Sequence, residues 1–302
     1  MREVVAVAGE VRDALETGLG VVALETSVIG QGLPVPRNRE CVERMGGAIR
    51  TAGAVPAWIG AAGGRVVVGL TDEDLARFCE PGTATKVARR DLPAAIASRG
   101  LGATTVSATV WAAAGAGIVV GATGGIGGVH PGPDPDVSAD LLELARTPGM
   151  LVCSGPKSII DPDATAEKLE ELGVALIGYR VARLPFFLAA EASVDLEHRA
   201  ASPAEAAALL GRALALGTRS TLVLCNPVPP SFAMDADEVA RAAREAERRA
   251  DAAGVHAKAR TPFLLGALAE LTDGRSLDAN LALLEGNARL AAEIAVTHAA
   301  AG

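Results

Sequence analysis

The sequence of 302 residues is half hydrophobic and only 3% aromatic, a balance that excludes a disordered chain and predicts a core of small aliphatic side chains. Its 36 acidic residues outnumber its 28 basic ones, for a formal net charge of -8, which disfavours binding to nucleic acid. The four cysteines stand singly, with no CxxC pair and no Cys/His cluster, so we expect reduced thiols in the core.

Two segments bear on localisation. The N-terminal stretch, MREVVAVAGEVRDALETG, contains Glu3, Glu10 and Asp13 and lacks the basic start and unbroken apolar run of a signal peptide. Residues 100–129 carry no charge and are long enough to span a bilayer, but their Gly, Thr and Ser content predicts buried strands joined by glycine turns. We therefore expect a cytoplasmic protein with no membrane partner.

Strands and helices alternate in the predicted secondary structure of residues 20–100. A buried strand, GVVALE, ends at Glu25, because a continuous apolar run between glycines suits a sheet that is covered on both faces. Two short strands are predicted on either side of a glycine turn at Gly63 and Gly64. Helices are predicted over residues 39–51, after the cap Thr71, and after the cap Asp91.

The rest of the chain repeats this alternation. The predicted strands are GIVVGATGG at 117–125, MLVCSG at 150–155, ALIGY at 175–179 and STLVLC at 220–225. The predicted helices cover 138–146, 161–173, 202–217 and 235–253, and two more begin at Thr261 and Ser276. Strands that alternate with helices, without a Pro/Ser-rich linker, predict an α/β fold: a single three-layer α/β/α domain over residues 1–302 with a mixed central sheet.

Eight strings, in this order, resemble the pseudouridine-5'-phosphate glycosidase family, also called indigoidine synthase A-like. They are ALETSVIGQGLPVPRNRE at 23–40, GAVPAWIG at 53–60, TKVARRDLP at 85–93, GATTVSATVWAAAGAGIVVGATGGIGGVH at 102–130, DVSADLLELARTP at 136–148, CSGPKSIIDPDATAEKLEELGV at 153–174, CNPVP at 225–229 and KARTPFLLGALAELTDG at 258–274. The resemblance implies an enzyme that reversibly cleaves the C–C bond of pseudouridine 5'-phosphate to give uracil and ribose 5-phosphate, uses Mn²⁺ and forms a homotrimer.

The bond in this substrate sets the chemistry that the residues must perform. Uracil and ribose are joined through carbon, so protonation of a nitrogen or oxygen leaving atom, the usual glycosidase route, is not available. An amine can instead form an imine at C1' of the opened ribose, after which uracil departs as a stabilised carbanion equivalent and is protonated. This route requires one lysine nucleophile and at least one acid.

Lys157 and Glu25 match the family's Schiff-base lysine and proton donor. Lys157 follows a predicted buried strand, in the uncharged context LVCSGP, although most lysines in such turns are solvated. Glu25 ends a strand, where side chains line the crevice of an open α/β sheet; a helix cap or an ion pair would explain it equally well. The adjacent Thr26 and Ser27 either bind substrate or bond to their own backbone.

Four further residues match substrate contacts of the family. Lys86, otherwise one charge in a basic cluster, matches an active-site lysine, and Val106, otherwise a core valine, matches a position that binds substrate through its backbone. His130 matches an active-site histidine, although a lone histidine is more often structural. Asn280 and Asn287 lie seven residues apart on one face of the last predicted helix, where an amide reaches substrate or caps a neighbouring segment; the resemblance favours Asn280.

The resemblance also implies a metal-binding loop. Asp136 matches the family's manganese ligand, and Ser138, Ala139 and Asp140 match the substrate-binding triplet beside it. A hard divalent cation that takes one carboxylate and several waters suits a site next to a phosphate ester. Asp134, Asp136 and Asp140 could equally cap the following helix, and the choice between Asp136 and Asp140 as the direct ligand stays open.

Two other interpretations compete with this one. GIVVGATGGIGG resembles the glycine-rich turn of short-chain dehydrogenases, which would make the chain an NAD(P) oxidoreductase. That fold places the turn near the N-terminus and requires a YxxxK pair, whereas Tyr179 is the only tyrosine and Arg183 stands four residues later. The third interpretation is a non-enzymatic trimeric or dimeric scaffold whose glycines serve close packing. In either case the charged stretch 235–253 is expected to be a solvated or a subunit-facing surface.

Overall fold

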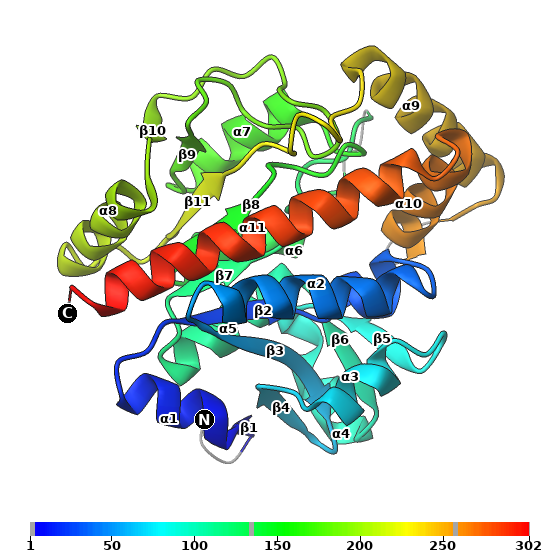
Figure 1. The fold of residues 1–302 in the computed structure, drawn as a ribbon. Coiled ribbons are helices and arrows are strands. Elements are labelled where there is room, and N and C mark those ends of the chain that lie inside the picture. The colour runs from blue at the N-terminus through cyan, green and yellow to red at the C-terminus, as the bar shows by residue number, and fades with distance from the viewer. Residues whose placement is uncertain (1–3, 133–135, 256–258, 302) are drawn as a thin grey trace.

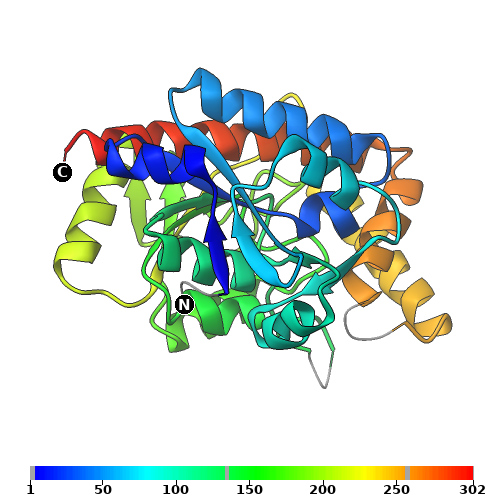
Figure 2. The same ribbon diagram turned by 90° about the horizontal axis from the view of Figure 1, so that it is seen from below.

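The computed structural model describes residues 4–132, 136–255 and 259–301. Helices pack on both faces of a mixed β-sheet (Figure 1, Figure 2), which confirms the predicted three-layer α/β/α arrangement. The described strands are β1 Val5–Val7, β2 Val21–Glu25, β3 Val55–Ala62, β4 Arg65–Val68, β5 Ala84–Val87, β6 Leu101–Thr104, β7 Val120–Ala122, β8 Gly149–Cys153, β9 Leu176–Tyr179, β10 His198–Ala200 and β11 Thr221–Cys225.

The sheet runs in the order β1-β4-β3-β2-β7-β8-β11-β9-β10, with β6 pairing with both β3 and β5 beside this path. Among the described pairs, only β3 with β4 and β3 with β6 are antiparallel. The β3–β4 pair is the predicted hairpin, and both turn residues, Gly63 and Gly64, have the positive φ angles that glycine adopts without strain. Since β2, β7, β8 and β11 are mutually parallel neighbours, their carboxyl ends meet at one edge.

The side chains of each strand divide between two helical layers with the period of two that a strand imposes. In β2, Val22 and Leu24 pack in the layer of α2, α8 and α11, whereas Val21 and Ala23 pack with α1, α4 and α5. The helices are α1 Gly9–Glu16, α2 Arg37–Thr51, α3 Asp72–Phe78, α4 Leu92–Ser98, α5 Val106–Ala116, α6 Ala139–Leu144, α7 Pro162–Glu171, α8 Pro203–Ala215, α9 Ala236–Ala252, α10 Arg260–Leu271 and α11 Arg275–Ala299, with shorter helical turns η1 Val28–Gly32 and η2 Arg89–Asp91.

The uncharged segment 100–129 is where the prediction from sequence was wrong. It forms β6, the helix α5 and β7 instead of strands alone. Seven residues of α5 are buried, from Val106 to Ala113, because the helix packs on the sheet with one side and on α6 with another. A helix that is apolar around its circumference shows no periodicity to reveal it. Among the helices of the described residues, none is long and apolar enough to cross a membrane.

The structure agrees in most details with the predicted helix starts and with the predicted state of the cysteines. Thr71 accepts a hydrogen bond from the backbone of Asp74 and Asp74 bonds back, as a capping box requires. Ser202 caps α8, but Glu205 accepts from the backbone of Ala201 rather than from that of Ser202. The last helix begins one residue before the predicted Ser276. All four cysteines are buried and free.

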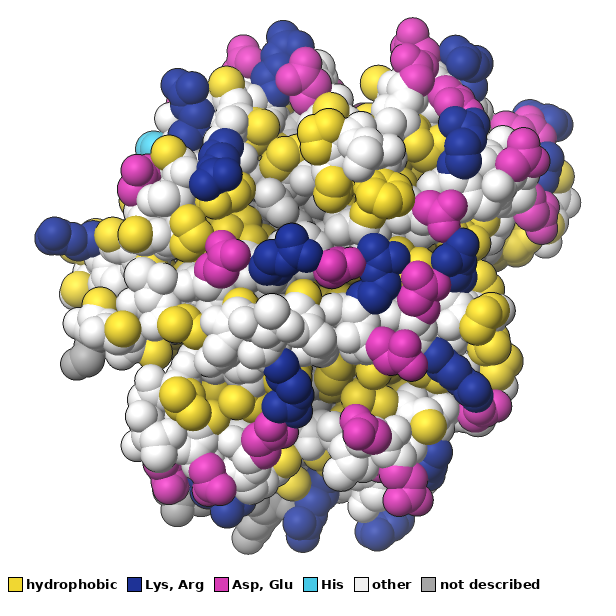
Figure 3. All heavy atoms as spheres, viewed as in Figure 1, with side chains coloured by type: hydrophobic (Ala, Val, Ile, Leu, Met, Phe, Trp, Pro, Cys, Tyr) yellow, Lys and Arg dark blue, Asp and Glu magenta, His cyan; other side chains and the backbone are white. Residues whose placement is uncertain are grey.

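The face seen in Figure 3 carries acidic and basic side chains that alternate. Part of this pattern joins α2 to α11: Arg37 pairs with Asp278 at 2.7 Å and Arg44 with Glu285 at 2.8 Å. Exposed pairs of this kind contribute about 0–1 kcal/mol each. The apolar contacts beneath them, which include Met45 and the buried leucines of α11, therefore provide most of the stability between the two helices.

The helices α9 and α10 form a pair near the carboxyl end of β8. Ala246 of α9 and Leu264 of α10 pack on Ile159 and Ile160, which follow β8 in the chain. Figure 1 shows this pair beyond one end of α11. Helices from late in the sequence thereby reach the edge of the sheet at which β2, β7 and β8 end.

Candidate active site

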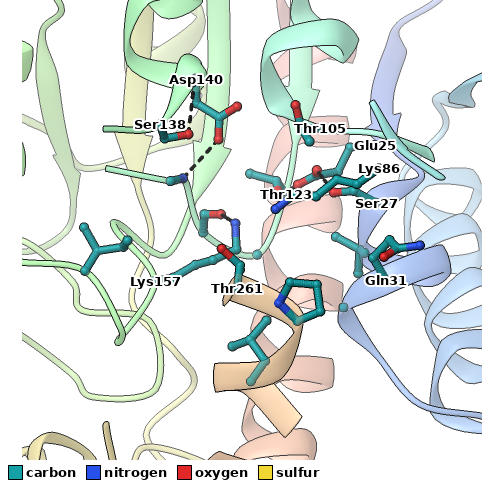
Figure 4. A pocket seen from close by; sticks show the side chains of 18 of the residues that line it. Glu25, Ser27, Gln31, Lys86, Thr105, Thr123, Ser138, Asp140, Lys157 and Thr261 are labelled. Atoms are coloured by element: carbon teal, nitrogen blue, oxygen red, sulfur yellow. Dashed lines mark hydrogen bonds between the residues drawn. The ribbon is translucent and has the colours of Figure 1, made fainter. Parts of the chain in front are cut away.

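The carboxyl ends of β2, β7 and β8 border a cavity of about 200 Å³ (Figure 4), the position at which open α/β sheets bind ligands. Nine of the ten site residues predicted from sequence line it: Glu25, Lys86, His130, Asp136, Ser138, Ala139, Asp140, Lys157 and Asn280. The tenth, Val106, is buried among apolar side chains at the start of α5. Thr105, the residue before Val106 and the N-cap of α5, lines the cavity instead.

Glu25 is a buried acid at the end of β2, only 4% exposed. Its carboxylate accepts hydrogen bonds from the hydroxyls of Ser27 and Thr123 (Figure 4), while Thr26 donates to a backbone carbonyl of β3. Burial raises the pKa of Glu25 above its usual value, and the nearby charge of Lys157 and the two hydroxyl donors oppose that rise. Glu25 therefore keeps its proton to a higher pH than an exposed glutamic acid does.

Lys157 lies in the turn between β8 and α7 and is partly buried. Its Nζ donates a hydrogen bond to the carbonyl of Gly125 at 2.5 Å, and its backbone N–H donates to the carbonyl of Ile126 at 3.1 Å. The segments that follow β7 and β8 thus run side by side. Since only β7 separates β2 from β8 in the sheet, the Lys157 amine and the Glu25 carboxyl enter the same cavity from nearby strand ends (Figure 4).

The glycine-rich segment after β7 serves close packing of loops. A Cβ atom on Gly125 would lie 2.8 Å from the ring of Phe187, and one on Gly127 would lie 2.3 Å from Oγ of Ser138. A dinucleotide-binding turn leads directly into a helix, whereas the next helix after β7 begins only at Ala139. The structure gives the dehydrogenase interpretation no support.

Positive side chains line the cavity from several elements. Lys86 projects from β5 and is partly buried, and Arg90 of η2 is largely exposed. With Lys157 they make three lysine and arginine side chains in the lining. Such an arrangement suits a ligand that carries a phosphate group.

Asp140 is buried, and both of its carboxylate oxygens accept backbone hydrogen bonds. Oδ1 accepts from the N–H of Ser107 at 3.0 Å, and Oδ2 accepts from the N–H of Gly127 at 3.1 Å (Figure 4). Ser138 caps α6 by accepting from the N–H of Asp140 at 3.2 Å. Asp140 therefore joins the start of α5 to the glycine-rich segment, and the capping role weighed for this loop belongs to Ser138.

Asp136 is the exposed carboxylate of the same loop. Its backbone carbonyl accepts a hydrogen bond from the N–H of His130 at 2.9 Å, and Asp134 lies outside the described residues. Within the described ranges, no group of three or more His, Cys, Asp or Glu side chains could hold a metal ion. A divalent cation here would take one protein carboxylate and complete its shell with water and substrate oxygens, a donor set that suits a hard ion such as Mg²⁺ or Mn²⁺.

Asn280 and Asn287 of α11 have different surroundings: one lies at the cavity and the other bonds to neighbouring segments. Asn280 lines the cavity, as does Phe187. Asn287 is fully buried; its Nδ2 donates to the carbonyl of Thr123 at 2.8 Å, and its Oδ1 accepts from Nδ2 of Asn226 at 2.9 Å. Asn287 therefore ties the ends of β7 and β11 to α11.

Several lining residues were not predicted from sequence: Gln31, Thr105, Thr123, Thr261, Pro262 and Leu265. Thr123 lies near the end of the strand predicted over 117–125, so the strand-end argument that singled out Glu25 applies to it as well. Thr261 and Pro262 open α10, and only the tertiary packing of α10 brings them to the cavity. No local pattern in the sequence carries that information.

Comparison with known proteins shows which family this chain resembles. A family model described as indigoidine synthase A like protein matches residues 10–297. The pseudouridine-5'-phosphate glycosidase of Sorangium cellulosum is 46% identical over 298 residues, 98% of this chain and 94% of that protein. The pseudouridine-5'-phosphate glycosidase of Symbiobacterium thermophilum is 46% identical over 294 residues, 95% of each chain.

Two solved structures share the fold over nearly the whole chain. An indigoidine synthase A-like protein from Thermotoga maritima is 38% identical with a TM-score of 0.89, covering 97% of this chain and 96% of its own. The prealnumycin C-glycosynthase AlnA, in complex with ribulose 5-phosphate, is 38% identical with a TM-score of 0.90, covering 99% and 98%. The resemblance seen in the sequence strings is confirmed, and this chain belongs to the indigoidine synthase A-like family.

Proposed function

We propose that this protein reversibly cleaves the C–C glycosidic bond of pseudouridine 5'-phosphate, giving uracil and ribose 5-phosphate. The observation that carries the proposal is the placement of an amine, Lys157, and a buried acid, Glu25, in one cavity. The names of relatives that are 46% identical over almost their whole length support it. So does the similarity to a C-glycosynthase that binds a pentose phosphate.

In the proposed mechanism, Glu25 donates its proton to the ring oxygen as the bond between that oxygen and C1' breaks, which opens the sugar. The neutral amine of Lys157 adds to C1'. The ammonium formed by this addition loses a proton to the Glu25 carboxylate, and the freed nitrogen lone pair forms an iminium with C1' as the bond to uracil breaks. The uracil carbon takes the proton from Glu25. Addition of water to the iminium releases ribose 5-phosphate, regenerates the lysine and returns a proton to Glu25. Burial of Glu25 supports its role, because the carboxyl must hold a proton when substrate binds.

The other predicted residues are proposed to hold the substrate. Lys86 contributes positive charge for the phosphate, as does Arg90. Val106 contributes only its backbone N–H, at the start of α5, where helix N-termini favour anions. The remaining contacts come from other residues that line the cavity, namely His130, Ser138, Ala139, Asp140 and Asn280.

Asp136 is the residue that we propose would hold Mn²⁺. Its exposed carboxylate lines the cavity, whereas the oxygens of Asp140 already accept backbone hydrogen bonds. The bound ion would supply positive charge opposite the substrate's phosphate and hydroxyl oxygens. A homotrimer in the cytoplasm remains our proposal for assembly and location; light scattering of the purified protein tests the first and cell fractionation the second.

The test of the proposed function is product analysis. Pure protein with Mn²⁺ is incubated with pseudouridine 5'-phosphate, with uridine 5'-phosphate as the matched N-glycoside, and uracil is separated by chromatography. Uracil from the first substrate alone is the expected result. Uracil from neither substrate would contradict the proposal and favour the scaffold interpretation, as would thermal stability unchanged by ribose 5-phosphate.

A further inference from the structure

His130 lines the cavity, but one of its ring nitrogens is turned away from the ligand space. Its side chain is 12% exposed, and Nδ1 faces Oε1 of Glu247 at 3.8 Å. Both atoms are buried, and neither has a hydrogen-bond partner in the part of the chain that the structure describes. Glu247 lies on α9, an element that contributes no predicted site residue. Two buried polar atoms that lack a hydrogen-bond partner among the described residues and lie opposite each other call for a functional explanation.

An arginine side chain fixes the position of the Glu247 carboxylate. Its Oε2 accepts a hydrogen bond from Arg260, and both side chains are 17% exposed. Arg260 also pairs with Asp251 at 2.8 Å and donates to the carbonyl of Val255 at 3.1 Å. It is the first residue of α10, and the next two residues of that helix line the cavity. Arg260 of α10 thus fixes the Glu247 carboxylate of α9 beside Nδ1 of His130.

We propose that Glu247 is a positioning residue for His130, an inference that rests on the proposed function of the cavity. A carboxylate fixed beside one imidazole nitrogen sets the ring orientation and keeps the proton on that nitrogen, which leaves Nε2 as an acceptor toward the substrate. The 3.8 Å separation is longer than a hydrogen bond, as is common for site contacts that tighten when substrate binds. Arg260 leaves Glu247 one oxygen for His130.

The substitution Glu247→Gln tests this arrangement without changing side-chain size. Arg260 requires an acceptor, so the amide oxygen stays toward Arg260 and the amide NH₂ turns toward Nδ1 of His130. An NH₂ donor there favours the tautomer that carries its proton on Nε2. Glu245→Gln is the matched control, because Glu245 lies on the same helix and pairs with Arg248 and Arg249 instead.

The first measurement needs no substrate. Nitrogen-15 NMR of histidine-labelled protein at alkaline pH follows the ring nitrogens of only four histidines, and His130→Asn assigns the signal. We expect His130 to be protonated on Nδ1 in the wild type and to shift toward Nε2 protonation in Glu247→Gln, with no change in Glu245→Gln. An unchanged His130 signal in Glu247→Gln, or the same change in both variants, would overturn the inference.

The second measurement separates positioning from a purely structural role. With pseudouridine 5'-phosphate, Glu247→Gln should lower kcat/KM by about 10- to 100-fold, and it should cause no further loss in a protein that already carries His130→Asn. Losses that add in the double variant would refute the positioning role. A wild type that releases no uracil would refute the proposed function instead, while the NMR result would still decide whether Glu247 sets the state of His130.

Discussion

The hydroxyl of Thr123, just after β7, donates a hydrogen bond to Oε1 of Glu25, at the end of β2. Ser27 donates to the other carboxylate oxygen, so hydroxyl groups hold both oxygens of a buried acid. The parallel pairing of β2 with β7 brings the acid and one of its donors together at the same sheet edge. This contact links the order of strands in the sheet to the protonation of Glu25.

Thr123→Val should raise the pKa of Glu25 further, because it removes a hydrogen bond that favours the charged form. In the proposed mechanism activity requires protonated Glu25 and falls as pH rises through that pKa, so the alkaline limb of the kcat/KM profile should move to higher pH. Thr109→Val is the matched control, since Thr109 is also buried and donates to Thr104 rather than to Glu25. Equal shifts in the two variants would contradict this assignment.

Glu25→Gln should lower kcat by about 10²- to 10⁴-fold, the usual contribution of a general acid. Ribose 5-phosphate should still bind, since the amide preserves the shape of the side chain. Steady-state kinetics and calorimetric titration measure the two effects. Normal turnover in this variant would exclude Glu25 as the acid.

The raised pKa of Glu25 also predicts how stability depends on pH. Because burial favours the protonated form in the folded state, the contribution of Glu25 to stability is fully present below its unfolded pKa of about 4.5 and is lost as pH rises through the higher folded pKa. The free energy of unfolding of the wild type should therefore fall relative to that of Glu25→Gln over this range. A difference that does not vary with pH would mean that the pKa is not raised.

Asp136→Asn should affect the response to Mn²⁺, whereas Asp140→Asn should affect the stability of the fold. Asp136→Asn should abolish the stimulation of activity by Mn²⁺ and leave the melting temperature unchanged, because its carboxylate is exposed. Asp140→Asn should reduce the free energy of unfolding by about 1–3 kcal/mol, because one of two backbone N–H groups, of Ser107 or Gly127, loses its acceptor. Full Mn²⁺ stimulation in Asp136→Asn would disprove the metal assignment.

The two amides of α11 should also separate binding from stability. Asn287→Leu should destabilise the fold by about 1–3 kcal/mol, because it leaves the buried carbonyl of Thr123 and the amide of Asn226 without this partner. Asn280→Leu should raise KM and change the melting temperature little, since Asn280 lines the cavity. Denaturation curves and kinetics of both variants check the contrast, and a reversed pattern would exchange the two roles.

Much of the fold follows from local sequence patterns. The apolar run that ends at Glu25 is a strand buried on both faces, and the glycine turn at Gly63 is a hairpin. The helix α5 could not be predicted in this way, because burial on several sides removes the polar face that reveals an amphipathic helix. Residue composition alone left 106–116 indistinguishable from strands.

The candidate site likewise has a part that local sequence patterns predict and a part that depends on tertiary packing. Glu25 and Lys157 stand at strand ends, where sequence reasoning looks for ligand-binding side chains, and the structure places both in one cavity. The contact of His130 with Glu247 joins segments that lie far apart in the chain, and it depends on the tertiary packing of α9 on Ile159 and Ile160, which follow β8. Composition, spacing and periodicity contain no signal for such a pair.

The most direct test of the mechanism is to trap the covalent intermediate. The protein is incubated with pseudouridine 5'-phosphate and borohydride, which reduces an iminium to a stable amine, and the modified peptide is identified by mass spectrometry. The sequence has four lysines, Lys86, Lys157, Lys168 and Lys258, so the site of attachment is unambiguous. We predict a ribose phosphate adduct on Lys157 that is absent from Lys157→Ala and present in Lys168→Ala. An adduct on another lysine, or uracil release by Lys157→Ala at the wild-type rate, would contradict the imine mechanism.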